Sequence, residues 1–207
     1  MVVYSPRSFR ARQFASWSHR VHMDDQLVSQ DGVIIVSYFL PVILSKSKDG
    51  KTWTATWDGE NLLSLQMDLR LTWIGSIRFA NAPIPIEDEE AVSAALAELN
   101  CYPVFINQNM HFQFYDIFCK KNLWPIMHHI ADVYGPLNQN DIGAKAQQNL
   151  WFVYSTVHKL FREKVLEVYH EGYLIWIHGF HLMLLPNFLR RRLPTAKIGL
   201  LNHSFRY

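Results

Sequence analysis

Histidines stand where predicted strands end, and histidine is a side chain well suited to contact a ligand at neutral pH. His178 and His181 follow the apolar run that ends at Ile177, and His203 follows the last apolar run. His178 and His181 have the donor atoms of a metal site, but no third ligand stands at a convincing spacing, so we predict no metal. Hydrogen bonds from such rings to a ligand or to backbone are the more common arrangement. His203 could contact a phosphate or a sugar hydroxyl, and the alternative is a terminal histidine without a role.

Other patterns that could carry chemistry are absent or ordinary. The first strand is followed by Ser37-Tyr38-Phe39-Leu40-Pro41, which contains no glycine-rich phosphate-binding sequence. Arg190-Arg191-Arg192 is a basic run, which we interpret as a solvated helix end where cations face the negative pole of the helix dipole. No nucleophile elbow and no Cys–His arrangement is visible.

Apolar runs alternate with amphipathic segments along the chain. The predicted strands are 33–36, 52–57, 71–77, 102–106, 173–177 and 197–201, and the polar stretch 45–51 is predicted to be a loop. Helices are expected at about 87–99, at 110–131 with a break near Pro125, at 144–169 and at 182–192. In the segment 144–169, apolar residues recur at helical spacing: Leu150, Val153, Val157, Leu160, Phe161 and Val168.

The order of these elements predicts an α/β fold with a Rossmann-like, doubly wound parallel sheet. Strands that are unbroken apolar runs and alternate with helices are typical of a parallel sheet covered on both faces. Ligands bind such sheets beyond the carboxyl ends of the strands. The residues just after Val36, Ile177 and Leu201 are therefore candidates for a binding site.

Charge and composition exclude several functions. The net charge of +2 is too small for a general nucleic-acid footprint, and no apolar run reaches the length of about 18 residues that a bilayer span needs. Cys101 and Cys119 follow no metal or redox spacing, which favours a reducing, cytoplasmic setting. Residues 1–30 are polar and basic, with no acidic residue before Asp24, and are predicted to be a disordered leader. An organellar transit segment is the alternative.

Several segments together resemble the trehalose-6-phosphate synthases, retaining glycosyltransferases of the GT-B fold, and look closest to the synthase–phosphatase types of plants and oomycetes. Phe118–Pro125 resembles the family segment F-C-x-x-x-L-W-P, and Trp151–Phe161 carries W-x-x-Y-x-x-V-x-x-x-F. Trp176–Met183 resembles W-I/V-H-D-Y-H-L-M, and Ile198–Ser204 resembles I-G-F-F-L-H-S/T. The similarity covers roughly residues 30–204.

Members of this family transfer glucose from UDP-glucose to glucose-6-phosphate without a metal or other cofactor. The resemblance implies that residues 31–207 are an incomplete N-terminal GT-B domain, with the C-terminal nucleotide-binding domain absent from the chain. It implies that Tyr115 and Trp124 contact the acceptor, that His203 lies beside the donor sugar, and that His178 is a possible sugar contact. It also implies partners among the synthase or phosphatase subunits of a trehalose complex, and neither nucleic acid nor a membrane.

The sequence departs from the family pattern where that pattern carries chemistry. Tyr38-Phe39 stands in place of an Asn-Arg pair whose arginine grips the acceptor phosphate, a contact that Phe39 cannot supply. Gly179 replaces the aspartate that orients the acceptor hydroxyls, and the family's Gly-Gly loop has no counterpart around residues 45–51. We therefore expect a trehalose-6-phosphate synthase-like protein that is inactive by itself. The alternatives are a non-catalytic module that regulates a trehalose synthase complex and a fragment without function.

Overall fold

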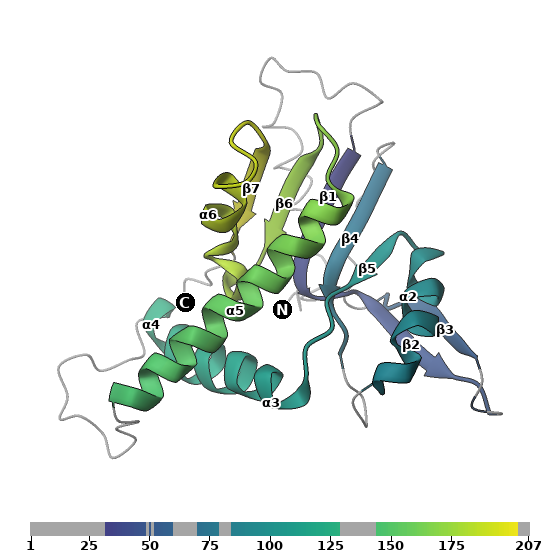
Figure 1. Ribbon diagram of the computed structural model, residues 1–207, viewed down its shortest axis with the longest axis horizontal. Helices are drawn as coiled ribbons and strands as arrows, with labels where there is room; N and C mark the ends of the chain where they lie inside the picture. Colours follow the sequence, from purple (N-terminus) through teal and green to yellow (C-terminus); the bar gives the residue numbers. More distant parts are fainter. Residues whose placement is uncertain are drawn as a thin grey trace, which may run out of the picture.

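A parallel sheet of five strands forms the centre of the molecule (Figure 1). The computed structural model describes residues 32–48, 50, 52–59, 70–78, 84–128 and 144–202, so the predicted leader and His203 lie outside the described residues. The sheet contains β1 (Gly32–Phe39), β4 (Arg70–Ser76), β5 (Cys101–Pro103), β6 (Leu174–His178) and β7 (Lys197–Leu201). Their order is β5-β4-β1-β6-β7, so the chain winds outward from β1 in both directions. This is the doubly wound α/β fold that the sequence predicts.

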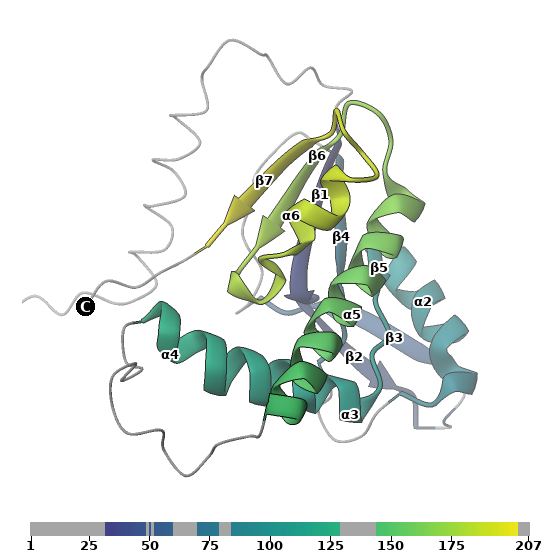
Figure 2. The ribbon, with the colours of Figure 1, turned by 60° about the vertical axis from the view of Figure 1, so that its left-hand side comes forward.

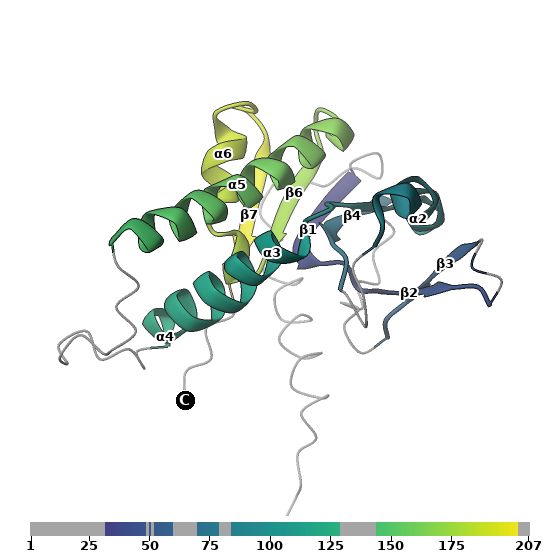
Figure 3. The same cartoon turned by 60° about the horizontal axis from the view of Figure 1, so that its bottom comes forward.

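Helices cover the sheet and cross its carboxyl end. The helical elements are η1 (Ile86–Asp88), α2 (Glu89–Ala97), α3 (Gln108–His111), η2 (Phe112–Leu123), α4 (Trp124–Met127), α5 (Ala144–Val168), η3 (Phe180–Leu182) and α6 (Leu185–Arg190). Figures 2 and 3 show α3, η2 and α4 as one continuous rod beside α5. The predicted break near Pro125 is wrong, because the rod changes its hydrogen bonding there instead of ending. The π-helical η2 closes with the Trp124 N–H donating to Cys119, and Pro125 has no N–H with which to continue that pattern.

Successive side chains of β1 point to opposite faces of the sheet, and both faces are buried at this strand. Ile34 and Val36 point into a cluster formed with η2, α5 and α6, whereas Val33 and Ile35 point into a second cluster formed with α2. All four side chains are at most 1% exposed. Burial of each such side chain contributes about 1.5–3 kcal/mol. The strand is an unbroken apolar run because neither of its faces meets water.

A separate antiparallel hairpin joins β1 to β4. It consists of β2 (Val42–Lys46) and β3 (Trp53–Trp57). The predicted loop is therefore wrong for Ser45 and Lys46, which pair with Thr54 and Trp53. Polar residues are accepted in these strands because one face of the hairpin is exposed, while Trp53 turns toward the second cluster.

The remaining elements lie close to their predicted positions, with some corrections. β5 ends at Pro103, and the next residues, Val104 and Ile106, are buried in the first cluster without continuing the strand. The predicted helix at 182–192 is divided into η3 and the shorter α6. Leu160, expected in the core, is 37% exposed, and His158 of the same helix is fully buried.

Candidate functional site

The carboxyl ends of β1, β4 and β6 meet at one edge of the sheet, where the strand order reverses between β1 and β6. The rod of α3, η2 and α4 lies across this edge (Figure 2). In doubly wound sheets this reversal is the place where ligands bind. The side chains that follow β1, β4 and β6, together with those on the rod, therefore form the candidate site.

Tyr38 is the centre of a stack of aromatic rings at this edge. Its side chain is 2% exposed, and its ring centroid lies 5.2 Å from that of Tyr115 and 5.6 Å from that of His181, with interplanar angles of 9° and 19°. Its hydroxyl oxygen lies 2.8 Å from Nδ1 of His111. These residues come from β1, from the rod and from η3 after β6, so the stack joins the elements that meet here.

Burial keeps the polar groups of this stack uncharged. Desolvation raises the pKa of the Tyr38 phenol far above its ordinary value and lowers the pKa of His111. We therefore assign the proton between them to the phenol, which donates to Nδ1. Burial, with smaller contributions from His178 and Lys120, lowers the pKa of His181 to about 4. At neutral pH the stack offers hydrogen bonds and ring faces, and no charge.

An open hollow of about 320 Å³ adjoins the stack and is lined by Phe39, Arg78, His111, Tyr115 and Asp116. This volume lies at the lower end of the range for small-molecule sites. The rings of Phe39 and Tyr115 meet edge-on, with centroids 5.1 Å apart, and give the hollow aromatic walls. The guanidinium carbon of Arg78 lies 5.0 Å from the Phe39 ring centroid. Asp116 forms an ion pair with Lys120 at 3.1 Å.

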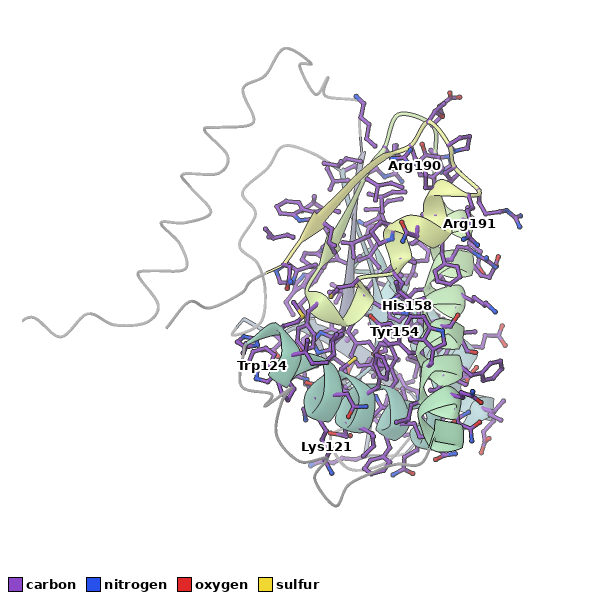
Figure 4. The ribbon with its side chains drawn as sticks, turned by 90° about the vertical axis from the view of Figure 1, so that its left-hand side faces the viewer. Lys121, Trp124, Tyr154, His158, Arg190 and Arg191 are labelled. Carbon is purple, nitrogen blue, oxygen red and sulfur yellow. The ribbon has the colours of Figure 1, made fainter. Side chains whose placement is uncertain are left out.

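Of the two predicted acceptor residues, Tyr115 lines the hollow and Trp124 does not. The Trp124 ring stacks on His128 with centroids 3.6 Å apart and packs against Phe180 at 5.3 Å. Figure 4 shows Trp124 at the α4 end of the rod. His178 ends β6 and pairs in register with Ser37, so it lies beside the strand ends and outside the lining of the hollow.

Gly179 has a backbone conformation that non-glycine residues rarely adopt. Its φ is 89° and its ψ is 160°, and its N–H donates to the Leu201 carbonyl at 2.8 Å. Among the described atoms, an added Cβ would have His181 Nδ1 as its nearest neighbour, at 3.6 Å, so space is not the obstacle. The obstacle is the backbone, because this region is essentially restricted to glycine. An aspartate at this position would require a different local backbone.

Three residues that line the hollow, Arg78, His111 and Asp116, were not predicted from the sequence. A signal for Arg78 is present, because it follows the apolar run that ends at Ile77 and so occupies the same kind of strand-end position as His178. His111 and Asp116 carry no comparable signal. They line the hollow because the rod lies across the strand ends, and the order of elements along the chain does not specify that placement.

Within the described ranges, no group of three or more His, Cys, Asp or Glu side chains is placed to hold a metal ion. No helix in the same part of the chain is long and apolar enough to cross a membrane. A reaction without a metal stays a prediction that rests on the family resemblance.

Curated plant proteins are similar to most of this chain. The alpha,alpha-trehalose-phosphate synthase (UDP-forming) 5 of Arabidopsis thaliana is 34% identical over 184 residues, covering 86% of this chain and 20% of the relative. Synthase 6 of the same plant is 32% identical over 203 residues, covering 87% of this chain and 23% of the relative. The chain therefore spans between a fifth and a quarter of the length of these relatives. The predicted similarity to plant-type proteins is confirmed.

Solved structures share the fold. The N-terminal domain of Candida albicans trehalose-6-phosphate phosphatase superposes with a TM-score of 0.57 at 22% identity, covering 84% of this chain and 35% of that one. The alpha,alpha-trehalose 6-phosphate synthase of Burkholderia multivorans gives 0.55 at 18% identity, covering 84% of this chain and 33% of that one. The family model for glycosyltransferase family 20 matches residues 31–205. With most of its length matched and the fold in agreement, the chain belongs to glycosyltransferase family 20.

Proposed function

We propose that this chain is the acceptor-binding part of a trehalose-phosphate synthase domain and that its hollow holds glucose-6-phosphate. The observation that carries the proposal is a small hollow with aromatic walls at the strand ends of a glycosyltransferase family 20 chain. Tyr115 and Phe39 present ring surface against which the apolar face of a sugar packs. His111 and Asp116 add polar groups that fix the orientation of the sugar hydroxyls.

Glucose transfer from UDP-glucose would need a donor site in addition to this hollow. Such a reaction depends on positioning two substrates and on stabilising charge in the transition state. Since the chain spans only 20% of a curated relative's length, we assign the transfer to a longer protein or an assembly that contains this chain. The contribution of the chain itself is to hold and orient the acceptor.

A second candidate function is a non-catalytic module that binds the sugar phosphate and regulates a synthase or phosphatase partner. The conformation of Gly179 favours it, because the family aspartate that would orient the acceptor hydroxyls has no counterpart in this backbone. Phe39 favours it as well, because it offers no charge at the end of β1. The two candidates share acceptor binding and differ in turnover.

The state of the thiols supports a reducing, cytoplasmic setting for either function. Cys101 and Cys119 are both free and buried. Burial raises the pKa of Cys101 to about 12 and raises that of Cys119 as well, so both thiols stay protonated at neutral pH. Protonated, buried thiols are poor nucleophiles and resist oxidation.

Calorimetric titration of the purified chain with glucose-6-phosphate and with UDP-glucose tests the proposal. We expect glucose-6-phosphate to bind and Tyr115→Ala to weaken binding by about fivefold or more, which corresponds to about 1 kcal/mol of ring contact. Trp151→Ala is the matched control, because Trp151 is 54% exposed on α5 and does not line the hollow.

The outcomes separate the candidates. UDP release from UDP-glucose and glucose-6-phosphate by a longer protein or assembly that contains this chain would favour the catalytic function, and acceptor binding there without UDP release would favour the module. Heat from neither ligand, with a folded chain, would contradict both.

A further inference from the structure

Arg78 is a cation in the wall of the hollow, and none of the residues that the structure describes forms an ion pair with it. It follows β4, and its exposed side chain lies over the Phe39 ring. Its guanidinium group also forms no hydrogen bond with any described residue, and its one described contact is that with Phe39. The acidic residue of the same hollow, Asp116, is neutralised by Lys120. The hollow therefore has a positive end at Arg78 whose charge is not compensated by the described protein.

The contact with Phe39 positions this charge without using its hydrogen-bond donors. A cation–π contact engages the charge of the guanidinium group, while the five N–H donors stay available to a ligand. The planar fork of an arginine matches two oxygens of a phosphate at once. An apolar ring that holds an arginine at the rim of a small hollow is thus a suitable support for an anion contact.

The rest of the hollow has no net charge, because Asp116 is paired with Lys120, whose ammonium lies 4.4 Å from the Tyr115 ring centroid. The carboxylate of Asp116 still accepts hydrogen bonds from hydroxyl groups. Tyr115 and Phe39 supply the aromatic walls. A ligand with a phosphate near Arg78 and hydroxyls near Asp116 matches this arrangement.

We propose that Arg78 binds the phosphate of the ligand in the hollow and thereby selects a sugar phosphate over the unphosphorylated sugar. This inference rests on the proposed function, in which the hollow holds glucose-6-phosphate. It assigns the phosphate contact to the end of β4, the neighbour of β1 in the sheet. Phe39 at the end of β1 then acts as the support for that contact.

The test is calorimetric titration of the whole chain and of Arg78→Gln with glucose-6-phosphate and with glucose. We expect Arg78→Gln to weaken glucose-6-phosphate binding by about tenfold or more, the effect of losing a charge-assisted contact, and to leave glucose binding unchanged. Arg191→Gln is the matched control, since it removes the same charge from an exposed residue directly after α6, at the far end of the molecule from Lys121 (Figure 4). Raising the salt concentration should weaken glucose-6-phosphate binding by the wild-type chain more than binding by Arg78→Gln.

A second variant, Arg78→Lys, keeps the charge and loses the fork. Binding of glucose-6-phosphate by Arg78→Lys should lie between the wild type and Arg78→Gln. Equal affinity of Arg78→Gln and the wild type for glucose-6-phosphate would overturn the role of Arg78 and leave the proposed function standing. No binding of glucose-6-phosphate by the folded wild-type chain would overturn both. Equal losses for glucose and glucose-6-phosphate would also overturn the phosphate contact.

Discussion

Gly75 is the position where a single methyl group should disturb both the sheet and the candidate site. A Cβ built on Gly75 of β4 would lie 2.8 Å from the Leu40 nitrogen, 2.8 Å from the Ser37 carbonyl oxygen and 3.0 Å from the Phe39 carbonyl carbon. All three atoms are backbone, and they lie in or directly after the irregular end of β1, where the register shifts between Val36 and Phe39. A backbone segment cannot rotate away as a side chain does. The end of β1 would therefore have to move.

The magnitude follows from what holds that segment in place. The Leu40 N–H donates to the Ser76 carbonyl at 2.9 Å, and the Ser37 hydroxyl donates to the Phe39 carbonyl at 2.7 Å. Overpacking costs about 1–3 kcal/mol, and each hydrogen bond lost or distorted adds about 0.5–1.5 kcal/mol. We expect Gly75→Ala to lower the free energy of unfolding by about 2–4 kcal/mol. Since the moved segment carries Tyr38 and Phe39, sugar-phosphate binding should weaken as well.

Urea unfolding followed by tryptophan fluorescence measures this loss, because the chain has 7 Trp residues. Gly199→Ala in β7 is the matched control, since among the described atoms a Cβ there meets nothing within 4 Å. Its free energy of unfolding should stay within about 0.5 kcal/mol of the wild type or rise slightly. A loss below 1 kcal/mol in Gly75→Ala, or equal losses in the two variants, would refute the reasoning from close backbone contact.

Further predictions concern the pH dependence of stability, the loop after α6 that Arg190 contacts, and Gly179. Burial holds the pKa values of His158 and His181 at about 4, below the ordinary 6.5, so the unfolded chain binds more protons. The free energy of unfolding should then fall by up to about 3 kcal/mol per histidine between pH 6.5 and 4, and a flat profile in urea titrations would contradict this. Arg190→Gln removes the donor to the carbonyls of Leu193, Pro194 and Ala196 and should cost about 1–2 kcal/mol in urea unfolding, whereas Arg191→Gln should cost almost nothing. Gly179→Asp should cost about 1–3 kcal/mol, and an unchanged midpoint would show that the backbone is not glycine-restricted.

Periodicity predicted the fold because the strands of this sheet are mostly apolar runs, and the central strand β1 is buried on both faces. Residues 33–36 and 197–201 are recognisable from their apolar runs alone, and the long helix was placed to within a residue at each end. The hairpin was harder, because a strand with one exposed face contains polar residues such as Ser45 and Lys46. The π-helical segment could not be predicted from Pro125, which ends a hydrogen-bonding pattern without ending the helix.

Site residues at the ends of strands can be predicted from the sequence, whereas those on the rod of α3, η2 and α4 cannot be predicted from the order of elements. Tyr115 came from the family resemblance, and Arg78 follows the strand-end rule. His111 and Asp116 depend on how the rod crosses the sheet, which is a tertiary property. Trp124 was predicted to contact the acceptor because its motif is intact. The structure instead packs its ring against His128 and Phe180, outside the lining of the hollow.

A crystal structure of the chain with glucose-6-phosphate tests the central claim most directly. The account predicts electron density for the sugar phosphate in the hollow, with the sugar ring against Tyr115 and Phe39 and the phosphate within hydrogen-bond distance of Arg78. Density at another place, such as the face of Trp124, or an empty hollow at a saturating ligand concentration, would contradict it.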